Sequence, residues 1–226
     1  MAWQDTLIGL MAAWLLLAGS AYIAHRQALG LSRAMLVASI RGPIQLIILA
    51  SVLHWIFDIQ AIGLQIIIMI GFCLLAAQTS ASHHPQRRQA WMASSIGLLC
   101  GCAVTLPWLI WAGAIDSHTR ALIPLASMVA ANGMNAMSMM FERIRQGGNE
   151  GEGIRIALIP TIDTLRVVGL VHMPGIFVGM ILAGSPPLQA ATAQLTVLYM
   201  IVASSFTACI ISFLCLNHWA KKKYTP

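Results

Sequence analysis

The chain has 226 residues, of which 58% are hydrophobic and 9% are charged, and its formal net charge is +6. This composition excludes a separate soluble module and predicts a single integral membrane domain over residues 1–226. The positive charge does not indicate nucleic-acid binding, because the basic residues lie beside apolar stretches, where anionic lipid head groups attract them. The five cysteines lie inside apolar stretches without metal or redox spacing, which predicts that they are packing residues.

Seven apolar stretches alternate with short polar connections. They cover approximately residues 6–24, 34–57, 61–80, 90–115, 121–141, 167–183 and 188–216. Most of them reach the ~20 residues that a helix needs to cross the hydrocarbon layer. The sequence therefore predicts an all-α polytopic membrane protein with about seven transmembrane helices. No Lys or Arg precedes the first stretch, so we expect it to remain as a span and not to be removed as a signal peptide.

Basic residues are concentrated in every second connection. This set contains Arg26, Arg33, Arg87, Arg88, Arg143, Arg145, Arg155, Lys221, Lys222 and Lys223. The amino-terminal segment and the other connections carry Asp5, Asp58, Asp116 and Arg120. By the positive-inside rule the N-terminus lies outside and the C-terminus in the cytoplasm. An odd number of spans requires the same arrangement, so the two patterns agree.

Arg41 and Gln45 in the second stretch share one helix face, because they are four residues apart. An ionisable group at membrane depth needs water or a partner, so both side chains are candidates for a polar substrate pathway. The alternative is an arginine that extends its head group to the inner membrane surface. The sequence favours neither interpretation.

Two glycine steps have the spacing of close helix contacts. Gly97 and Gly101 form one in the fourth stretch, and Gly175, Gly179 and Ala183 form a longer one in the sixth. Small residues four apart let two helix backbones approach each other in a membrane. We therefore expect a helix contact at each step.

The fifth stretch carries amides and thioethers on neighbouring turns. Asn132 and Asn135 share a face, with Met128 four residues before the first and Met139 four residues after the second. Such groups can line a route for a soft or borderline metal ion. The alternative is hydrogen bonding between helices within a methionine-filled core.

The polar stretch over residues 142–155 is rich in glycine and predicts a flexible cytoplasmic linker. After it, Pro160 and Thr161 predict the start of a short interfacial helix, with Asp163 in its first turn. Pro174 followed by Gly175 predicts that the sixth span is bent or partly broken.

Asp163 and Arg166 are three residues apart and can pair. The pair is either a hinge that transmits the motion of a partner or part of a static interfacial helix. His172, beside the Pro-Gly break, is a candidate metal ligand together with Met139, the alternative being a hydrogen-bonded histidine. His83 and His84 are expected in a solvated inner loop.

Catalytic motifs are absent from the sequence. Every lysine lies in the final tail, so the chain has no Walker A loop and any ATP must be bound by a partner chain. There is also no serine-hydrolase or zinc-protease signature. The sequence therefore predicts a protein that is not an enzyme and binds no cofactor of its own.

One tract resembles a known family. Residues 157–175, ALIPTIDTLRVVGLVHMPG, followed by Gly179 and the pair Ala183-Gly184, are similar to the signature of the FetB-type permeases. Arg41 with IQLI at 44–47, IPLA at 123–126 and MVAAN at 128–132 with Met134 also fit the family. The resemblance covers nearly the whole chain in order.

The resemblance implies the membrane subunit of an ABC exporter in the bacterial inner membrane, working as a homodimer with two separate ATPase chains. The family is implicated in iron export, and its plant relatives in aluminium tolerance and nucleotide-sugar export. The expected cargo is a metal ion, iron first. Alternatives are a nucleotide sugar or another organic anion, or a membrane scaffold that does not transport.

The sequence departs from the family pattern after the fifth span. Relatives carry a longer cytoplasmic stretch there, thought to dock on the ATPase, whereas this chain has only the glycine-rich segment after Arg145. The remaining contact with the ATPase is then expected at the turn from Pro160 to Arg166.

Overall fold

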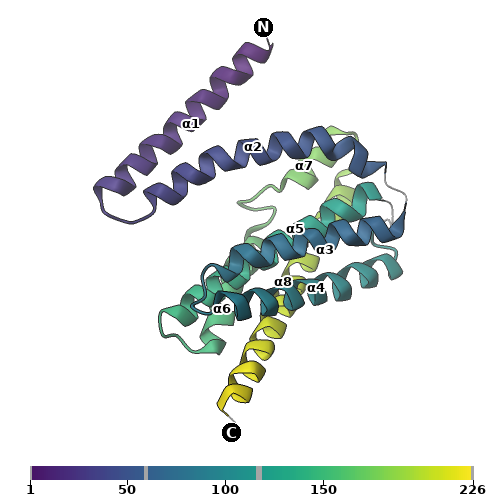
Figure 1. Cartoon of the computed structure of the whole chain (residues 1–226). Helices are drawn as coiled ribbons and strands as arrows, with labels where there is room; N and C mark the ends of the chain where they lie inside the picture. The colour runs from purple at the N-terminus through teal and green to yellow at the C-terminus, as the bar shows by residue number, and fades with distance from the viewer. Residues whose placement is uncertain (1, 59–60, 116–118, 225–226) are drawn as a thin grey trace. The chain divides into compact units, whose positions relative to one another are not determined.

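The computed structural model describes residues 2–58, 61–115 and 119–224 (Figure 1). The regular elements of these residues are eight α-helices, α1 to α8. The chain forms two compact units, Met1–Asp58 and Ile59–Pro226. The prediction of an all-α protein is confirmed for the described residues.

The first unit is a pair of helices, α1 (Ala2–Arg26) and α2 (Ser32–Phe57). The turn between them needs two residues in the left-handed region, Ala28 at φ 52° and Gly30 at φ 69°. Ala21, Ala24 and Ser39 are buried in this pair. Most of the large apolar side chains of both helices are exposed, as expected for helices whose solvent is lipid.

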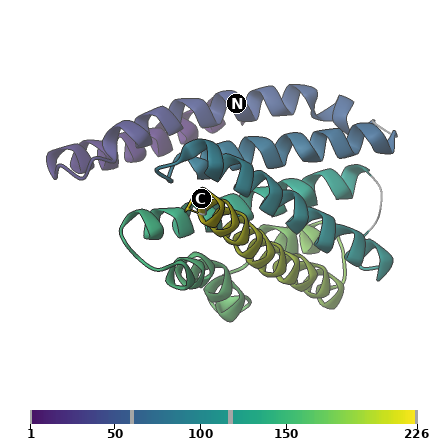
Figure 2. The same ribbon diagram turned by 60° about the horizontal axis from the view of Figure 1, so that its bottom comes forward.

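The second unit contains the other six helices. They are α3 (Ile62–Ala81), α4 (Arg87–Trp111), α5 (Thr119–Arg145), α6 (Glu150–Val167), α7 (Gly175–Leu182) and α8 (Pro187–Tyr224). Helix α8 packs against α4 and α5, and also against α6 and α7. Figure 2 shows α8, in yellow, between α4 in teal and α6 in green.

The closest helix contact of this unit joins α4 to α8. A Cβ atom at Gly97 would lie 2.5 Å from the carbonyl oxygen of Ala208, and one at Gly101 would lie 3.0 Å from that of Ser204. Ser212 Oγ donates a hydrogen bond to the carbonyl of Ala93 across the same contact, at 3.0 Å. The helix contact predicted at Gly97 and Gly101 is confirmed.

The second glycine step has no such contact among the described residues. No atom lies within 4 Å of a Cβ atom built at Gly175 or Gly179. None of the residues of α7 is buried. The prediction of a close helix contact there is therefore wrong for the structure described.

Five helices of the described chain are long and apolar enough to cross a membrane: α1, α2, α3, α4 and α8. Helix α5 has the length, but its polar residues keep it out of this group. Helix α7 has eight residues and a length of only ~12 Å. The membrane fold is thus supported, while the count of seven spans and the orientation stay predictions. Asp116 and the side chains of Asp5, Arg120 and Lys221 to Lys223 lie outside the described residues.

The predicted flexible linker over residues 142–155 is wrong. Only residues 146–149 lie between α5 and α6, with Gly147 at φ 86°. Asn149 caps α6, because its Oδ1 accepts a hydrogen bond from the backbone N–H of Glu152 at 2.8 Å. Arg143 also pairs with Glu152 at 2.9 Å, which ties α5 to the first turn of α6. Asparagine followed three residues later by glutamate is a start signal that resembles the capping box.

Pro160 lies inside α6 and does not start it, so the helix start predicted at Pro160 and Thr161 is also wrong. Asp163 consequently lies near the C-terminal end of the helix and not in its first turn. Proline has no N–H, so the carbonyl of Ile156 lacks its usual helical partner. The helix begins at Glu150, ten residues before Pro160, because Asn149 caps it there.

The predicted break of the sixth span is confirmed, and it is longer than a bend. Helix α6 ends at Val167, and α7 begins at Gly175, directly after Pro174. Between them Gly169, at φ 80°, donates its N–H to the carbonyl of His172 at 3.0 Å. Residues 167–183 are therefore not one continuous helix.

The cysteines behave as packing residues. Cys73, Cys102 and Cys209 are buried in the core of the second unit, and all five cysteines are free thiols. The sulfur atoms of Cys73 and Cys102 are 3.6 Å apart, which is ordinary contact between α3 and α4.

Candidate functional site

A cavity of about 200 Å³ lies between α5, α6 and α8. Its lining consists of Asn132, Asn135, Ala136 and Met139 of α5, Ala157, Pro160, Thr161 and Thr164 of α6, and Leu198 and Ile201 of α8. The cavity brings together two groups that the sequence assigned to different roles. The amides predicted for a substrate pathway share it with the proline predicted for coupling.

Helix α5 presents its amides to the cavity because its other side is locked in the core. Met137, Met140 and Phe141 are fully buried and fix the rotation of the helix. Asn132 and Asn135 then lie three residues apart on the cavity side. The orientation of both amides is set by apolar packing and not by the cavity itself.

The side-chain N–H of Asn132 forms a hydrogen bond within its own helix. Its Nδ2 donates a hydrogen bond to the backbone carbonyl of Met128 at 2.9 Å. The side chain of Met128 does not line the cavity, so its predicted place on the pathway reduces to this backbone contact. An amide oxygen such as Oδ1 of Asn132 can accept a hydrogen bond or coordinate a cation.

Helix α6 contributes oxygen atoms to the same wall. Thr164 Oγ1 donates a hydrogen bond to the carbonyl of Pro160 at 2.8 Å, and Thr161 lies beside them. The described lining residues include no ionisable group, but they offer amide and hydroxyl oxygens together with the thioether of Met139. Such a set can accept donors or coordinate a cation, and it has no acid, base or activated nucleophile for catalysis.

Arg41 and Gln45 lie in the first unit, one turn apart on α2, and both are exposed. The cavity belongs to the second unit. A common pathway lined by both groups therefore stays a prediction.

Asp163 and Arg166 form the predicted ion pair. Arg166 Nη1 donates to Asp163 Oδ1 at 2.9 Å, and the two side chains are 73% and 51% exposed for Arg166 and Asp163 respectively. A pair this exposed contributes only ~0.2–1 kcal/mol. Neither residue lines the cavity, so their role as a hinge, with Pro160, Pro174 and Gly175, stays a prediction.

His172 is exposed in the loop between α6 and α7 and does not line the cavity. Within the described ranges no group of three histidine, cysteine or acidic side chains could hold a metal ion. The role of His172 as a metal ligand therefore stays a prediction.

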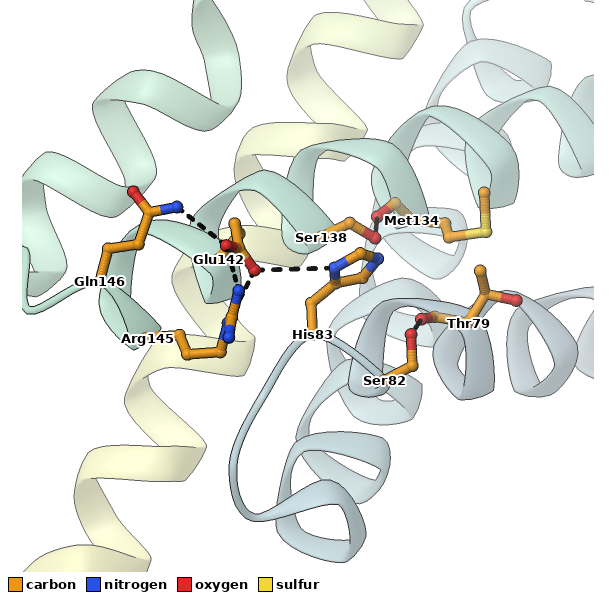
Figure 3. A network of polar contacts seen from close by, with 8 residues as sticks. All are labelled: Thr79, Ser82, His83, Met134, Ser138, Glu142, Arg145 and Gln146. Atoms are coloured by element: carbon orange, nitrogen blue, oxygen red, sulfur yellow. Dashed lines mark hydrogen bonds and ion pairs between the residues drawn. The ribbon is translucent and has the colours of Figure 1, made fainter. Parts of the chain in front are cut away.

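A polar network at the ends of α3 and α5 was not predicted (Figure 3). Glu142 accepts hydrogen bonds from Arg145 at 2.6 and 2.9 Å and from Gln146 at 2.8 Å. His83 Nδ1 lies 3.9 Å from Glu142 Oε2, so the network reaches from α5 to the turn after α3. Arg145, followed by Gln146, lowers the pKa of Glu142 to about 2. The spacing of three and four residues after Glu142 was the available signal.

His84 departs from the solvated loop that was expected. Its ring packs edge-on against Phe141, with the ring centroids 5.3 Å apart. This partial burial lowers its pKa, because desolvation disfavours the charged imidazolium. His83 is exposed, as expected.

A family profile decides what this helical membrane protein is. The profile of UPF0014, described as an uncharacterised protein family, matches residues 7–153 and 149–219. The chain belongs to the UPF0014 family. The two matched segments of the UPF0014 profile overlap over residues 149–153, at the start of α6.

Several members of the UPF0014 family match most of the chain. "Probable iron export permease protein FetB" of Escherichia coli (strain K12) is 30% identical over 84% of this chain and 82% of its own length. "UPF0014 membrane protein STAR2" of Oryza sativa subsp. japonica is 27% identical over 94% of this chain and 84% of its own. "Protein ALUMINUM SENSITIVE 3" of Arabidopsis thaliana is 25% identical over 89% and 83%. The resemblance to FetB-type permeases is confirmed, and no solved structure matches.

Proposed function

We propose that this protein is the membrane-spanning subunit of an exporter that moves a metal cation, iron first, across the bacterial inner membrane. The energy comes from ATP hydrolysis on a separate ATPase subunit, and the chain works as a homodimer with two such subunits. The observation that carries the proposal is the cavity between α5, α6 and α8. The printed name of the Escherichia coli relative supports iron as the cargo.

The chemistry of the cavity favours a cation. Its polar groups are neutral amide and hydroxyl oxygens, and Met139 adds a polarisable sulfur that suits a borderline transition metal. The described lining offers no positive group to pair with an anion. Neutral ligands also bind a metal ion more weakly than carboxylates do, and a transported ion must leave its site again.

Coupling to the ATPase acts through α6. This helix carries Pro160, Thr161 and Thr164 of the cavity wall. Its first turn is tied to α5 by the ion pair of Arg143 with Glu152. Pro160 leaves one helical hydrogen bond unmade, so α6 bends most easily beside the cavity. A partner that pushes on α6 therefore changes the distance between its hydroxyls and the amides of α5.

The test is iron export by variants of the full chain, expressed with its ATPase in cells loaded with radioactive iron. Asn132→Leu with Asn135→Leu removes both amides and is expected to abolish export at an unchanged amount of protein in the membrane. Thr164→Val is expected to lower export. Its matched control is Thr207→Val, because Thr207 also donates to the carbonyl four residues earlier, at 2.8 Å, but lies away from the cavity. Normal export by the double variant would contradict the proposal.

An organic anion, such as a nucleotide sugar, is the second candidate cargo. It is favoured by Arg41, an exposed charge on α2 for which the described chain shows no ion pair. An anion needs such a partner, whereas a cation is repelled by it. If Arg41→Gln abolishes nucleotide-sugar transport and leaves iron export unaltered, the metal proposal fails. Failure of the chain to copurify with any ATPase would instead favour a scaffold that does not transport.

A further inference from the structure

Two buried oxygen atoms of α8 have no hydrogen-bond partner in the described structure. They are Oε1 of Gln194 and Oγ of Ser205. Gln194 is 5% exposed and Ser205 is 0% exposed, so neither oxygen is served by open solvent. A buried polar atom without a partner is rare and costs free energy, because it loses its hydrogen bond to water and forms no other. Helix packing alone does not account for either residue.

Gln194 and Ser205 fall on the same side of α8 as the cavity wall by helix register, although neither of them lines the cavity itself. Leu198 and Ile201 form the α8 wall of the cavity. Gln194 precedes Leu198 by four residues, and Ser205 follows Ile201 by four. All four residues fall within an arc of about 60° on an ideal helix. The two oxygens therefore lie one turn on either side of the cavity wall, about 16 Å apart along the axis.

Neighbouring serines show that this lack of a partner is not general on α8. Ser204 is equally buried, but its Oγ donates to the carbonyl of Ile201 at 3.1 Å. Ser212 is buried as well and donates to the carbonyl of Ala93 on α4. These two serines lie at the contact with Gly97 and Gly101. Of these three buried serines of α8, only Ser205 has a hydroxyl without a partner.

We propose that Gln194 and Ser205 are ligands of the transported cation, one on each side of the cavity between α5, α6 and α8. This inference rests on the proposed function. A carbonyl oxygen such as Oε1 can only accept, so it attracts a cation and repels an anion, and a serine hydroxyl also accepts. The ion then passes Gln194, the amides of Asn132 and Asn135, and Ser205, and each step exchanges neutral oxygen ligands for similar ones. Several weak sites in a row allow both entry and release.

The first test is the binding of Fe²⁺ to the purified full chain in lipid nanodiscs, by anaerobic equilibrium dialysis. Gln194→Leu and Ser205→Ala are each expected to raise the apparent Kd for Fe²⁺ by at least about tenfold, since even groups outside the ligand shell change metal affinity by that factor. Ser204→Ala is the matched control and is expected to bind as the wild type does. Gln194→Glu adds a charge at the same position and is expected to lower the Kd and to slow export.

The second test is thermal unfolding of the same variants, which separates a ligand from a packing residue. The removed oxygens have no partner, so Gln194→Leu and Ser205→Ala are expected to unfold at or above the wild-type temperature, and Ser204→Ala below it. Wild-type Fe²⁺ affinity in Gln194→Leu and Ser205→Ala overturns the inference, and so does a lower unfolding temperature in both. If the wild type neither binds nor exports Fe²⁺, the proposed function itself fails.

Discussion

Helices α1 and α2 are as apolar as α4 and α8, yet far fewer of their residues are buried. Within the spanning windows 11% of α1 and 6% of α2 are buried, against 50% of α4 and 44% of α8. The glycines of the two pairs have different surroundings. Gly97 and Gly101 bring α4 within contact of the α8 backbone, whereas a Cβ atom at Gly19 or Gly42 would meet nothing within 4 Å. Both pairs contain glycines, so a small residue marks a close helix contact only where the backbone of another helix lies against it.

The largest expected effect is at the α4–α8 contact. Gly97→Val places a branched side chain against the carbonyl of Ala208, and we expect a loss of about 3 kcal/mol in the free energy of unfolding. Gly19→Val in α1 is the matched control and is expected to change that free energy by less than about 1 kcal/mol. Unfolding monitored by circular dichroism in detergent measures both. Equal losses in the two variants would remove the contrast between the helix pairs.

A smaller effect is expected from the hydroxyl that bridges the same contact. Ser212→Ala removes the hydrogen bond from Ser212 Oγ to the carbonyl of Ala93, and we expect a loss of about 1 kcal/mol. Ser39 of α2 donates only to Leu36 in its own helix, so Ser39→Ala is expected to cost less. The same unfolding measurement compares them. A larger loss for Ser39→Ala than for Ser212→Ala would show that the hydrogen bond between α4 and α8 does not stabilise the second unit.

Alanine in place of glycine is expected to act with opposite sign in the two regions. Gly42→Ala in α2 has room for the new methyl group, and we expect a gain of about 0.5 kcal/mol from the reduced freedom of the unfolded chain. Gly101→Ala brings its methyl group 3.0 Å from the carbonyl of Ser204 and is expected to destabilise. The unfolding temperatures of both variants test this. Gains of the same sign would refute it.

The smallest expected effect lies at the exposed ends of α3 and α5. The pKa of Glu142 is lowered from 4.5 to about 2, mainly by Arg145, so the folded state favours the ionised carboxylate. Its stabilising effect is fully present above pH 4.5 and is lost as the pH falls toward 2. We therefore expect Glu142→Gln to unfold slightly below the wild type at pH 7 and at the same temperature near pH 2. A difference that does not change with pH would contradict this assignment.

Local patterns predicted several features correctly. Glycine spacing at Gly97 and Gly101 identified a real helix contact, because small residues act through the backbone wherever the partner comes from. A break beside Pro174 was also predicted, although α6 already ends at Val167 and Pro174 lies directly before the start of α7. Pro160 was read as a helix start because proline is common there, but the cap at Asn149 overrides it.

The site was only half predictable. Asn132 and Asn135 can be recognised from the sequence, because they are two amides in an apolar stretch. Their partners on α6 and α8 are set by tertiary packing, for which no local spacing gives a sign. Gln194 and Ser205 looked like ordinary polar residues of a span, because a sequence does not show whether a buried oxygen has a partner. Only the folded chain separates Ser205 from Ser204.

Helix α8 has 38 residues and contains neither glycine nor proline after Pro187. Its length of about 57 Å is nearly twice the hydrocarbon thickness of a bilayer. A helix without glycine or proline in its interior has no residue at which it bends easily, so it moves as a rigid body. If a neighbouring subunit tilts the C-terminal end of α8, Gln194 and Ser205 must move together. Both residues would then approach or leave a bound ion at the same time.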